Sequence, residues 1–193
     1  MRCMRGILAL TCALGATVAF AQQHPHGKAH TPSAQPYAGQ QTRAVASLSD
    51  EDVQGFLDGR GMGLAKSAEL NGHPGPMHVL ELAEELNLTA EQRKLVTAAF
   101  DRMKAKAKAL GEAFVKAEKA VDQAFKAGPA QASEVSARVA EANRLLGEVR
   151  LSHLLAHVGI TPVLTPEQRA RYAELRGYTG GTGHGPHKHQ HRH

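Results

Sequence analysis

Two long stretches of this chain carry apolar residues that alternate at spacings of four and three. The first pattern runs from residue 96 to residue 124 and the second from residue 135 to residue 160. The positions are Val96, Phe100, Met103, Ala107, Leu110, Phe114, Ala117, Val121 and Ala124, then Val135, Val139, Ala142, Leu146, Val149, His153, Ala156 and Ile160. A seam with a period of 3.5 residues needs an apolar partner along its whole length. Because Gly128 and Pro129 interrupt the chain between the stretches, we expect two long helices packed as an antiparallel hairpin.

Shorter helices are expected beside this hairpin. Ser49 precedes three acidic residues, a sequence typical of a helix start, and Pro76 suits the first turn of a helix that continues to residue 86. Ser133 is expected to cap the second long helix, and a last short helix should end near Tyr178. No segment alternates polar and apolar residues as strands do. The predicted fold class is therefore all-α, a long antiparallel helical hairpin with shorter flanking helices.

A pentapeptide of the form Leu-Thr-x-Glu-Gln occurs twice, at residues 88–92 and 164–168. In each copy the threonine and the glutamine form a capping box, so each copy predicts a helix start. Arg93 and Arg169 stand where a hydrophobic staple would need an apolar residue. The two leucines must therefore find apolar partners where the open end of the hairpin meets the flanking helices. The motif residues are Leu88, Thr89, Gln92, Leu164, Thr165 and Gln168.

Residues 1–21 have the pattern of a cleavable secretion signal. Arg2 and Arg5 precede an apolar stretch over residues 6–18, and a small-x-small sequence predicts cleavage near Ala21. A lipoprotein signal that uses Cys12 is disfavoured, because residues 9–11 fit a lipidation box poorly. The pattern is typical of bacteria and predicts a periplasmic protein. No later apolar run approaches the roughly 20 residues that span a bilayer, so no stable membrane insertion is expected.

Composition divides the rest of the chain into three parts. Residues 22–46 and 179–193 are rich in Gln, His, Pro and Gly with few large apolar residues, so we expect a disordered linker and a disordered tail around a helical domain over residues 47–178. Both cysteines belong to the signal, which leaves no disulfide and restricts any metal site to His, Asp, Glu or Met. The small basic excess does not indicate a nucleic-acid partner.

A histidine pair on the second long helix is the first candidate for a metal site. His153 and His157 are four residues apart and so project from one side of a helix, where they can share an ion. Residues that can add ligands from neighbouring elements are Asp101, Met103, His78 and Glu81. The alternative is that His153, which falls on the apolar seam, is a core histidine. Nearby lysines at 104, 106 and 108 would also repel a cation.

The tail is the second candidate. It carries His184, His187, His189, His191 and His193. Imidazoles at this density bind Zn, Ni, Cu or Co ions without a preformed site. The alternative is a solvated tail whose metal binding is incidental.

A charged surface of the first long helix offers a different kind of site. Lysines between residues 104 and 126 lie outside the seam, next to Leu95 and Val115, which the seam does not use. A basic surface with scattered apolar residues can hold unfolded chains weakly. The alternative is an ordinary solvated helix face.

The two pentapeptides, in an all-helical chain with a secretion signal, resemble the periplasmic LTXXQ-motif family over about residues 48–178. That family includes Spy and CpxP, which protect proteins during envelope stress, and related heavy-metal-responsive proteins of the CnrX and ZraP kind. The resemblance implies a hooked helical hairpin, usually as a homodimer, and either ATP-independent protection of unfolding proteins or binding of transition metals. The metal-responsive relatives use His, Glu and Met near the base of the hairpin.

We therefore expect a periplasmic stress-protection chaperone, most simply a homodimer, that holds unfolded periplasmic proteins and binds metal through its histidines. The alternative is a heavy-metal sensor or resistance protein whose metal site regulates a membrane signalling partner. No enzyme is expected, because the sequence contains no phosphate-binding loop, no His-Glu-x-x-His and no Gly-x-Ser-x-Gly. Neither function requires a cofactor beyond a possible Zn, Ni, Cu or Co ion.

Overall fold

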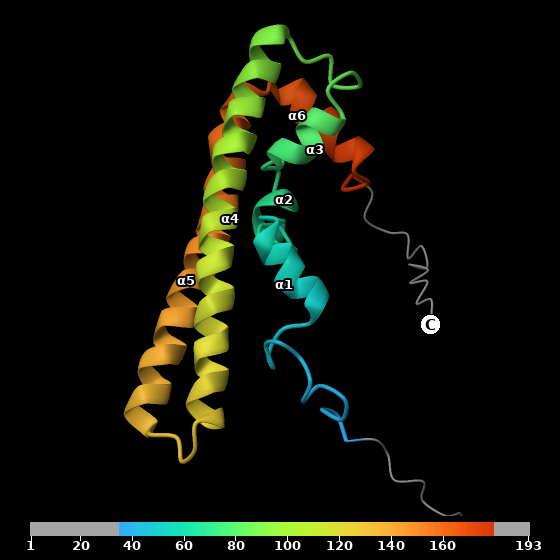
Figure 1. Ribbon diagram of the computed structural model, residues 1–193. Coiled ribbons are helices and arrows are strands. Elements are labelled where there is room, and N and C mark those ends of the chain that lie inside the picture. Colours follow the sequence, from blue (N-terminus) through green and yellow to red (C-terminus); the bar gives the residue numbers. More distant parts are fainter. Residues whose placement is uncertain (1–34, 180–193) are drawn as a thin grey trace, which may run out of the picture. The chain divides into compact units, whose positions relative to one another are not determined.

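The computed structural model describes residues 35–179, and within them the chain is helical and contains no strand (Figure 1). The helices are α1 (Asp50–Leu57), α2 (Lys66–Glu69), α3 (Pro76–Glu81), α4 (Ala90–Lys126), α5 (Ala132–Ile160), the 3₁₀ turn η1 (Thr161–Val163) and α6 (Pro166–Leu175). The predicted signal, most of the predicted linker and the histidine tail lie outside the described residues. The all-α prediction is confirmed.

The two long helices, α4 and α5, pack against each other along their length as an antiparallel hairpin (Figure 1). The seam positions form much of the contact, with Ala107, Phe114, Ala142 and Val149 all buried. One expected detail is wrong. Ser133 does not cap α5, because the helix already begins at Ala132 and Gln131 occupies the cap position without a side-chain hydrogen bond. We call the end where α4 begins and α5 ends the base of the hairpin.

Helix α1 packs directly on α4. Ser49 caps it in a capping box with Asp52, as the sequence predicted. The approach is so close that a Cβ at position 111 would lie 2.1 Å from the carbonyl oxygen of Phe56, which only glycine avoids. The ring of Phe56 then meets Phe114 edge to face, with centroids 4.6 Å apart. Val115, which the seam left free, is buried in the same cluster.

The contacts of the helical domain begin slightly before the predicted start at residue 47. Val45 is 1% exposed and belongs to the same apolar cluster as Phe56 and Phe114. The backbone N–H of Ala46 donates to the carboxylate of Asp122 on α4 at 2.8 Å. The end of the segment that the composition assigned to a linker is thus tied to the hairpin.

A second apolar cluster closes the base. Its buried members are Val79, Leu86, Val96, Ile160, Leu164 and Tyr172, with Leu88 packed against them. Both motif leucines have therefore found apolar partners where the hairpin meets the flanking helices, as expected. Helix α3 is shorter than predicted, because turns replace helix after Glu81. None of the described helices combines the length and the apolar character that crossing a membrane would need.

Candidate functional site

A cavity of about 330 Å³ lies beside the base of the hairpin, between the loop after α1, the start of α3, and facing turns of α4 and α5. Its side-chain donors are mainly imidazoles and thioethers, from Met62, Met77, Met103, His78, His153 and His157. Every methionine that follows the predicted signal is in this set. We refer to it as the His–Met cavity.

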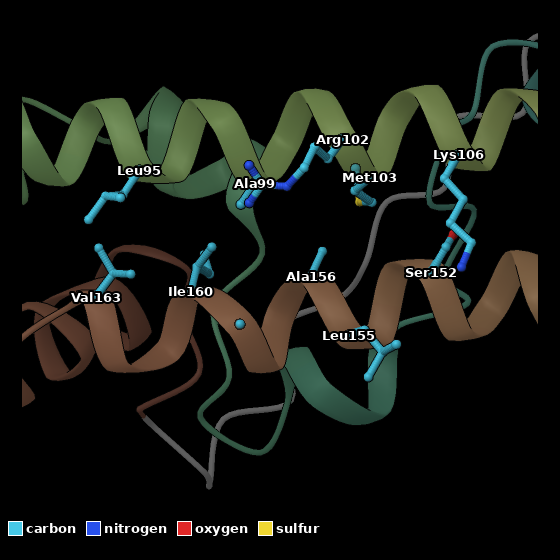
Figure 2. Close-up of a pocket in the computed structure, with 11 residues that line it drawn as sticks. Leu95, Ala99, Arg102, Met103, Lys106, Ser152, Leu155, Ala156, Ile160 and Val163 are labelled. Carbon is cyan, nitrogen blue, oxygen red and sulfur yellow. The ribbon is translucent and has the colours of Figure 1, made fainter.

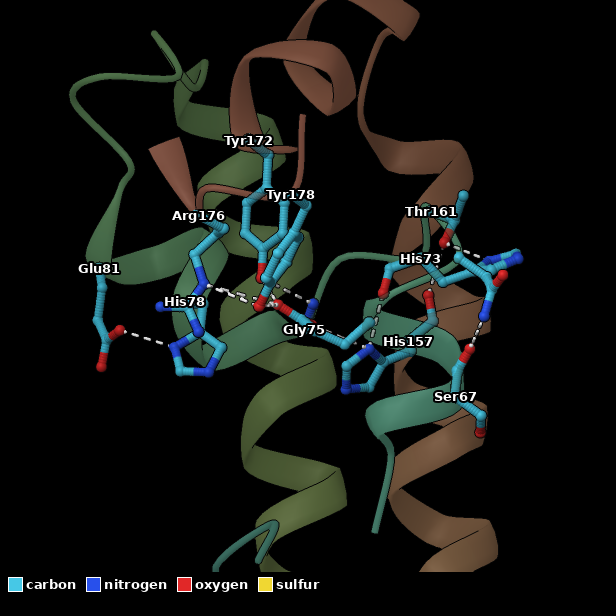
Figure 3. Close-up of polar contacts among 12 residues, drawn as sticks. Ser67, His73, Gly75, His78, Glu81, His157, Thr161, Tyr172, Arg176 and Tyr178 are labelled. Atoms are coloured by element: carbon cyan, nitrogen blue, oxygen red, sulfur yellow. Dashed lines mark hydrogen bonds and ion pairs between the residues drawn. The ribbon is translucent and has the colours of Figure 1, made fainter. Parts of the chain in front are cut away.

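His157 is held in one orientation by its surroundings (Figure 3). Its Nδ1 lies 2.8 Å from the backbone carbonyl oxygen of His73, and because a carbonyl only accepts, Nδ1 carries the proton. The other nitrogen, Nε2, keeps its lone pair. Gly75 borders the ring so closely that a Cβ there would lie 3.0 Å from Cε1. Imidazoles that ligate metals are usually fixed in this way, by a hydrogen bond from the second ring nitrogen.

A largely buried carboxylate, that of Glu69, lies beside this ring. Glu69 Oε2 lies 3.6 Å from Nδ1 of His157. The other oxygen of Glu69 accepts hydrogen bonds from the hydroxyl of Tyr172 and, at 3.1 Å, from that of Tyr178. Arg176 adds an ion pair at 3.7 Å (Figure 3). Burial, followed by the hydrogen bond to Glu69, raises the pKa of Tyr172 well above its ordinary value, so this hydroxyl stays a donor.

His153, one helical turn before His157, is the opposite case. It is 3% exposed, and neither ring nitrogen has a hydrogen-bond partner within residues 35–179. Burial, and to a smaller degree the nearby His157, lowers the pKa of His153 below 6.5. The ring is therefore neutral near pH 7 with an uncommitted lone pair. Buried polar atoms are normally partnered, and an exception needs a reason.

The remaining predicted ligands differ in where they lie. His78 lines the cavity and uses Nδ1 to contact Glu81 at 2.9 Å, which leaves Nε2 free. Asp101 is exposed and lines a separate hollow with Arg93 and Lys94, so the structure does not bring it to the histidines. In residues 35–179, no three His, Asp or Glu side chains are gathered as a metal-binding group. The additional donors are Met62 and Met77, which the sequence reading did not single out.

The two pentapeptides meet each other at the base. Gln92 donates to Gln168 at 2.8 Å and Gln168 donates back at 3.0 Å, although 76 residues separate them. Each amide also donates to a backbone carbonyl, of Val163 and Leu86 respectively. Each amide oxygen accepts from the N–H of its own capping threonine. Both capping boxes are present, as predicted, and they are joined into one closed network that we call the glutamine corner.

This corner coincides with what the chain shares with known proteins. A family model described as LTXXQ motif family protein matches residues 75–176, more than half of the chain. The chain belongs to the LTXXQ motif family. This is the family of Spy/CpxP-type periplasmic proteins. No curated protein and no solved structure matches the chain at a significant level.

This LTXXQ protein also carries an apolar groove between α4 and α5 (Figure 2). The groove has a volume of about 350 Å³ and is lined mainly by Leu95, Ala99, Leu155, Ala156, Ile160 and Val163. Arg102 and Lys106 stand at its side, and neither has an acidic partner within the described residues. Met103 lines both the groove and the His–Met cavity. Leu95 is thus available at the surface as the sequence suggested, whereas Val115 is not.

Proposed function

We propose that this LTXXQ protein is a periplasmic chaperone that holds unfolding proteins without ATP. The observation that carries the proposal is the apolar groove between α4 and α5. Of its lining residues, Leu155 is 55% exposed and Leu95 46%. Leu151 and Val158, which lie one turn to either side of Leu155 on α5, are also exposed. Adjoining apolar side chains of this size at a surface are typical of an interaction site rather than of a solvated helix face.

The charge beside the groove supports an unfolded chain as its ligand. Arg102 and Lys106 attract acidic segments at long range, and the apolar floor then gives short-range contacts that depend little on sequence. Such contacts are individually weak, which suits a client that must be released without ATP. We expect the protein to act as a homodimer, in which each copy contributes one groove.

A double variant tests this role. Leu95→Ser with Leu155→Ser should reduce suppression of client aggregation several-fold, measured by light scattering of a chemically unfolded protein, because it removes exposed apolar area from the groove lining without touching the buried seam. Val139→Ser is the matched control and should change little, because this valine near the other end of α5, which the sequence placed on the seam, is 38% exposed. Equal activity in the wild type and the double variant would contradict the groove as the client site.

A second function is favoured by the His–Met cavity: a heavy-metal sensor or resistance protein that controls a membrane signalling partner. The oriented Nε2 of His157 and the unpartnered ring of His153 support it. Calorimetry should then show one tight site that disappears in His153→Ala with His157→Ala, while suppression of aggregation is unchanged. Deletion of residues 184–193 should remove weaker Zn, Ni, Cu or Co binding and leave that site. Both proposed functions are non-catalytic.

A further inference from the structure

We infer that the His–Met cavity binds a soft monovalent ion, Cu(I) or Ag(I), through methionine thioethers together with imidazole nitrogen. The inference rests on the second function proposed above and names the class of ion. Its basis is that three methionines from separate segments line one cavity with three histidines. Met62 comes from the loop after α1, Met77 from α3 and Met103 from α4.

The sulfur atoms of the cavity favour a soft ion. Thioethers are soft ligands, and a site with several of them and no carboxylate or thiolate ligand favours Cu(I) over Zn²⁺ and Ni²⁺. The described part of the chain has no cysteine, so methionine is its only source of sulfur. Met62 has a left-handed backbone, with φ of 45°, which is uncommon for a residue other than glycine. The loop thus holds an unusual conformation at the position that brings this side chain to the cavity.

Imidazole nitrogens of the same cavity can complete the ligand set. His153 is more than nine-tenths buried, lines the cavity and lacks any partner within residues 35–179. His157 is already fixed by the carbonyl of His73 and presents Nε2. Cu(I) and Ag(I) bind with few ligands, so two imidazoles and one or two thioethers are sufficient. A full set of three or four His, Asp and Glu side chains, which a divalent ion would need, is not gathered in the described residues.

The charge of the cavity lining favours a monovalent ion. Asp58 supplies the carboxylate of the lining and pairs with Arg60 at 4.0 Å, while Lys104 adds a positive charge. A divalent cation meets twice the repulsion that a monovalent cation meets from the same lysine. Lining charge and ligand softness therefore favour the same class of ion.

Methionine methyl NMR tests the inference directly. The secreted protein is labelled with ¹³C at its methionine methyl groups and titrated with Ag(I), a redox-inert probe of the same class. One equivalent should shift the signal of Met103 and of at least one of Met62 and Met77, while Zn²⁺ should leave all three unshifted. Leu95→Met places a further thioether on α4 outside the cavity, and its methyl should not respond at one equivalent.

Affinity measurements separate the cavity from the tail. Met103→Leu and His153→Leu should each weaken Cu(I) binding at least about tenfold in competition with a chromophoric Cu(I) chelator. Alanine at all five tail histidines should leave the tight site intact. Circular dichroism verifies that each variant is folded.

The outcomes distinguish the ion class from the proposed function. If Zn²⁺ shifts the imidazole signals of His153 and His157 while Ag(I) leaves the methionine methyl groups unmoved, the ion class is wrong and the metal-binding function stands. If neither ion perturbs the cavity, both fail.

Discussion

The glutamine corner and the His–Met cavity are neighbouring polar clusters that use their polar groups in opposite ways. In the corner, Gln92 and Gln168 use their amide donors and their amide oxygens in hydrogen bonds to each other and to nearby backbone groups. In the cavity, His153 is as buried as a core residue and has no hydrogen-bond partner in the described part of the chain. One cluster satisfies its polar groups internally, and the other leaves a buried ring nitrogen unsatisfied.

The glutamine corner is therefore suited to stabilising the fold, whereas the His–Met cavity is suited to binding. A satisfied network fixes the meeting point of elements far apart in sequence and leaves no atom available for chemistry. An unpartnered buried nitrogen costs stability, and binding of an ion is one of the roles that explain why such a group is retained. The family motif, although it identifies the chain, is thus a structural device, and the candidate chemistry lies in the histidines and methionines beside it.

Breaking the corner should have the largest effect. Gln92→Ala removes hydrogen bonds to Gln168 and Val163 and leaves their partly buried groups unpaired, so the free energy of unfolding should fall by about 2–3 kcal/mol. Denaturant titration measures the change. Gln123→Ala is the matched control, an exposed glutamine on the same helix, and should cost less than about 0.5 kcal/mol.

A double-mutant cycle sharpens the same point. Because Gln92 and Gln168 share two reciprocal hydrogen bonds, the double alanine variant should lose less stability than the two single variants together, by about 1 kcal/mol or more. Additive losses would show that the two capping boxes act independently.

The two cavity histidines should respond with opposite signs. His153→Leu removes an unpartnered buried polar ring and should raise the free energy of unfolding of the metal-free protein by about 1 kcal/mol. His157→Leu removes the donor to His73 and the neighbour of Glu69, and should lower it by about 1–2 kcal/mol. Thermal unfolding of both variants in the presence of a chelator makes the comparison. A loss of stability in both would mean that His153 is an ordinary core residue.

The smallest effect concerns pH. Folding lowers the pKa of His153 below 6.5, chiefly through burial, so the unfolded chain binds more protons than the folded one just below that pH. The free energy of unfolding is therefore unaffected by this group above about pH 6.5 and decreases as the pH falls below it, because the unfolded chain takes up the proton more readily. His153→Leu should flatten the decline in melting temperature between about pH 7.5 and pH 5.5. An unchanged slope would indicate that His157 or another group controls it.

The sequence predicted most of the fold because its signals are local. Spacings of four and three place Phe114 and Val149 in the interface, and a capping box marks the start of α4 and of α6 without any tertiary information. Pairing of Gln92 with Gln168 was not predicted, since no local pattern shows that two caps 76 residues apart meet.

The candidate site was predicted in part. His153, His157 and Met103 follow from the hairpin register, whereas Asp101, two residues from Met103, points to a different side of the helix, as residues at that spacing do. Met62 and Met77 were missed because they lie on short elements whose placement depends on packing. Their one sequence signal was that Met62, Met77 and Met103 are the only methionines after the predicted secretion signal.

Met103 is common to the two candidate sites, because it lines both the His–Met cavity and the apolar groove. An ion that fixed its sulfur would freeze part of the groove floor, and any change in client affinity would be matched by an equal change in ion affinity, as thermodynamic reciprocity requires. Aggregation suppression with and without Ag(I) would measure that exchange. A single molecule would then couple its response to metal ions with its response to unfolded proteins.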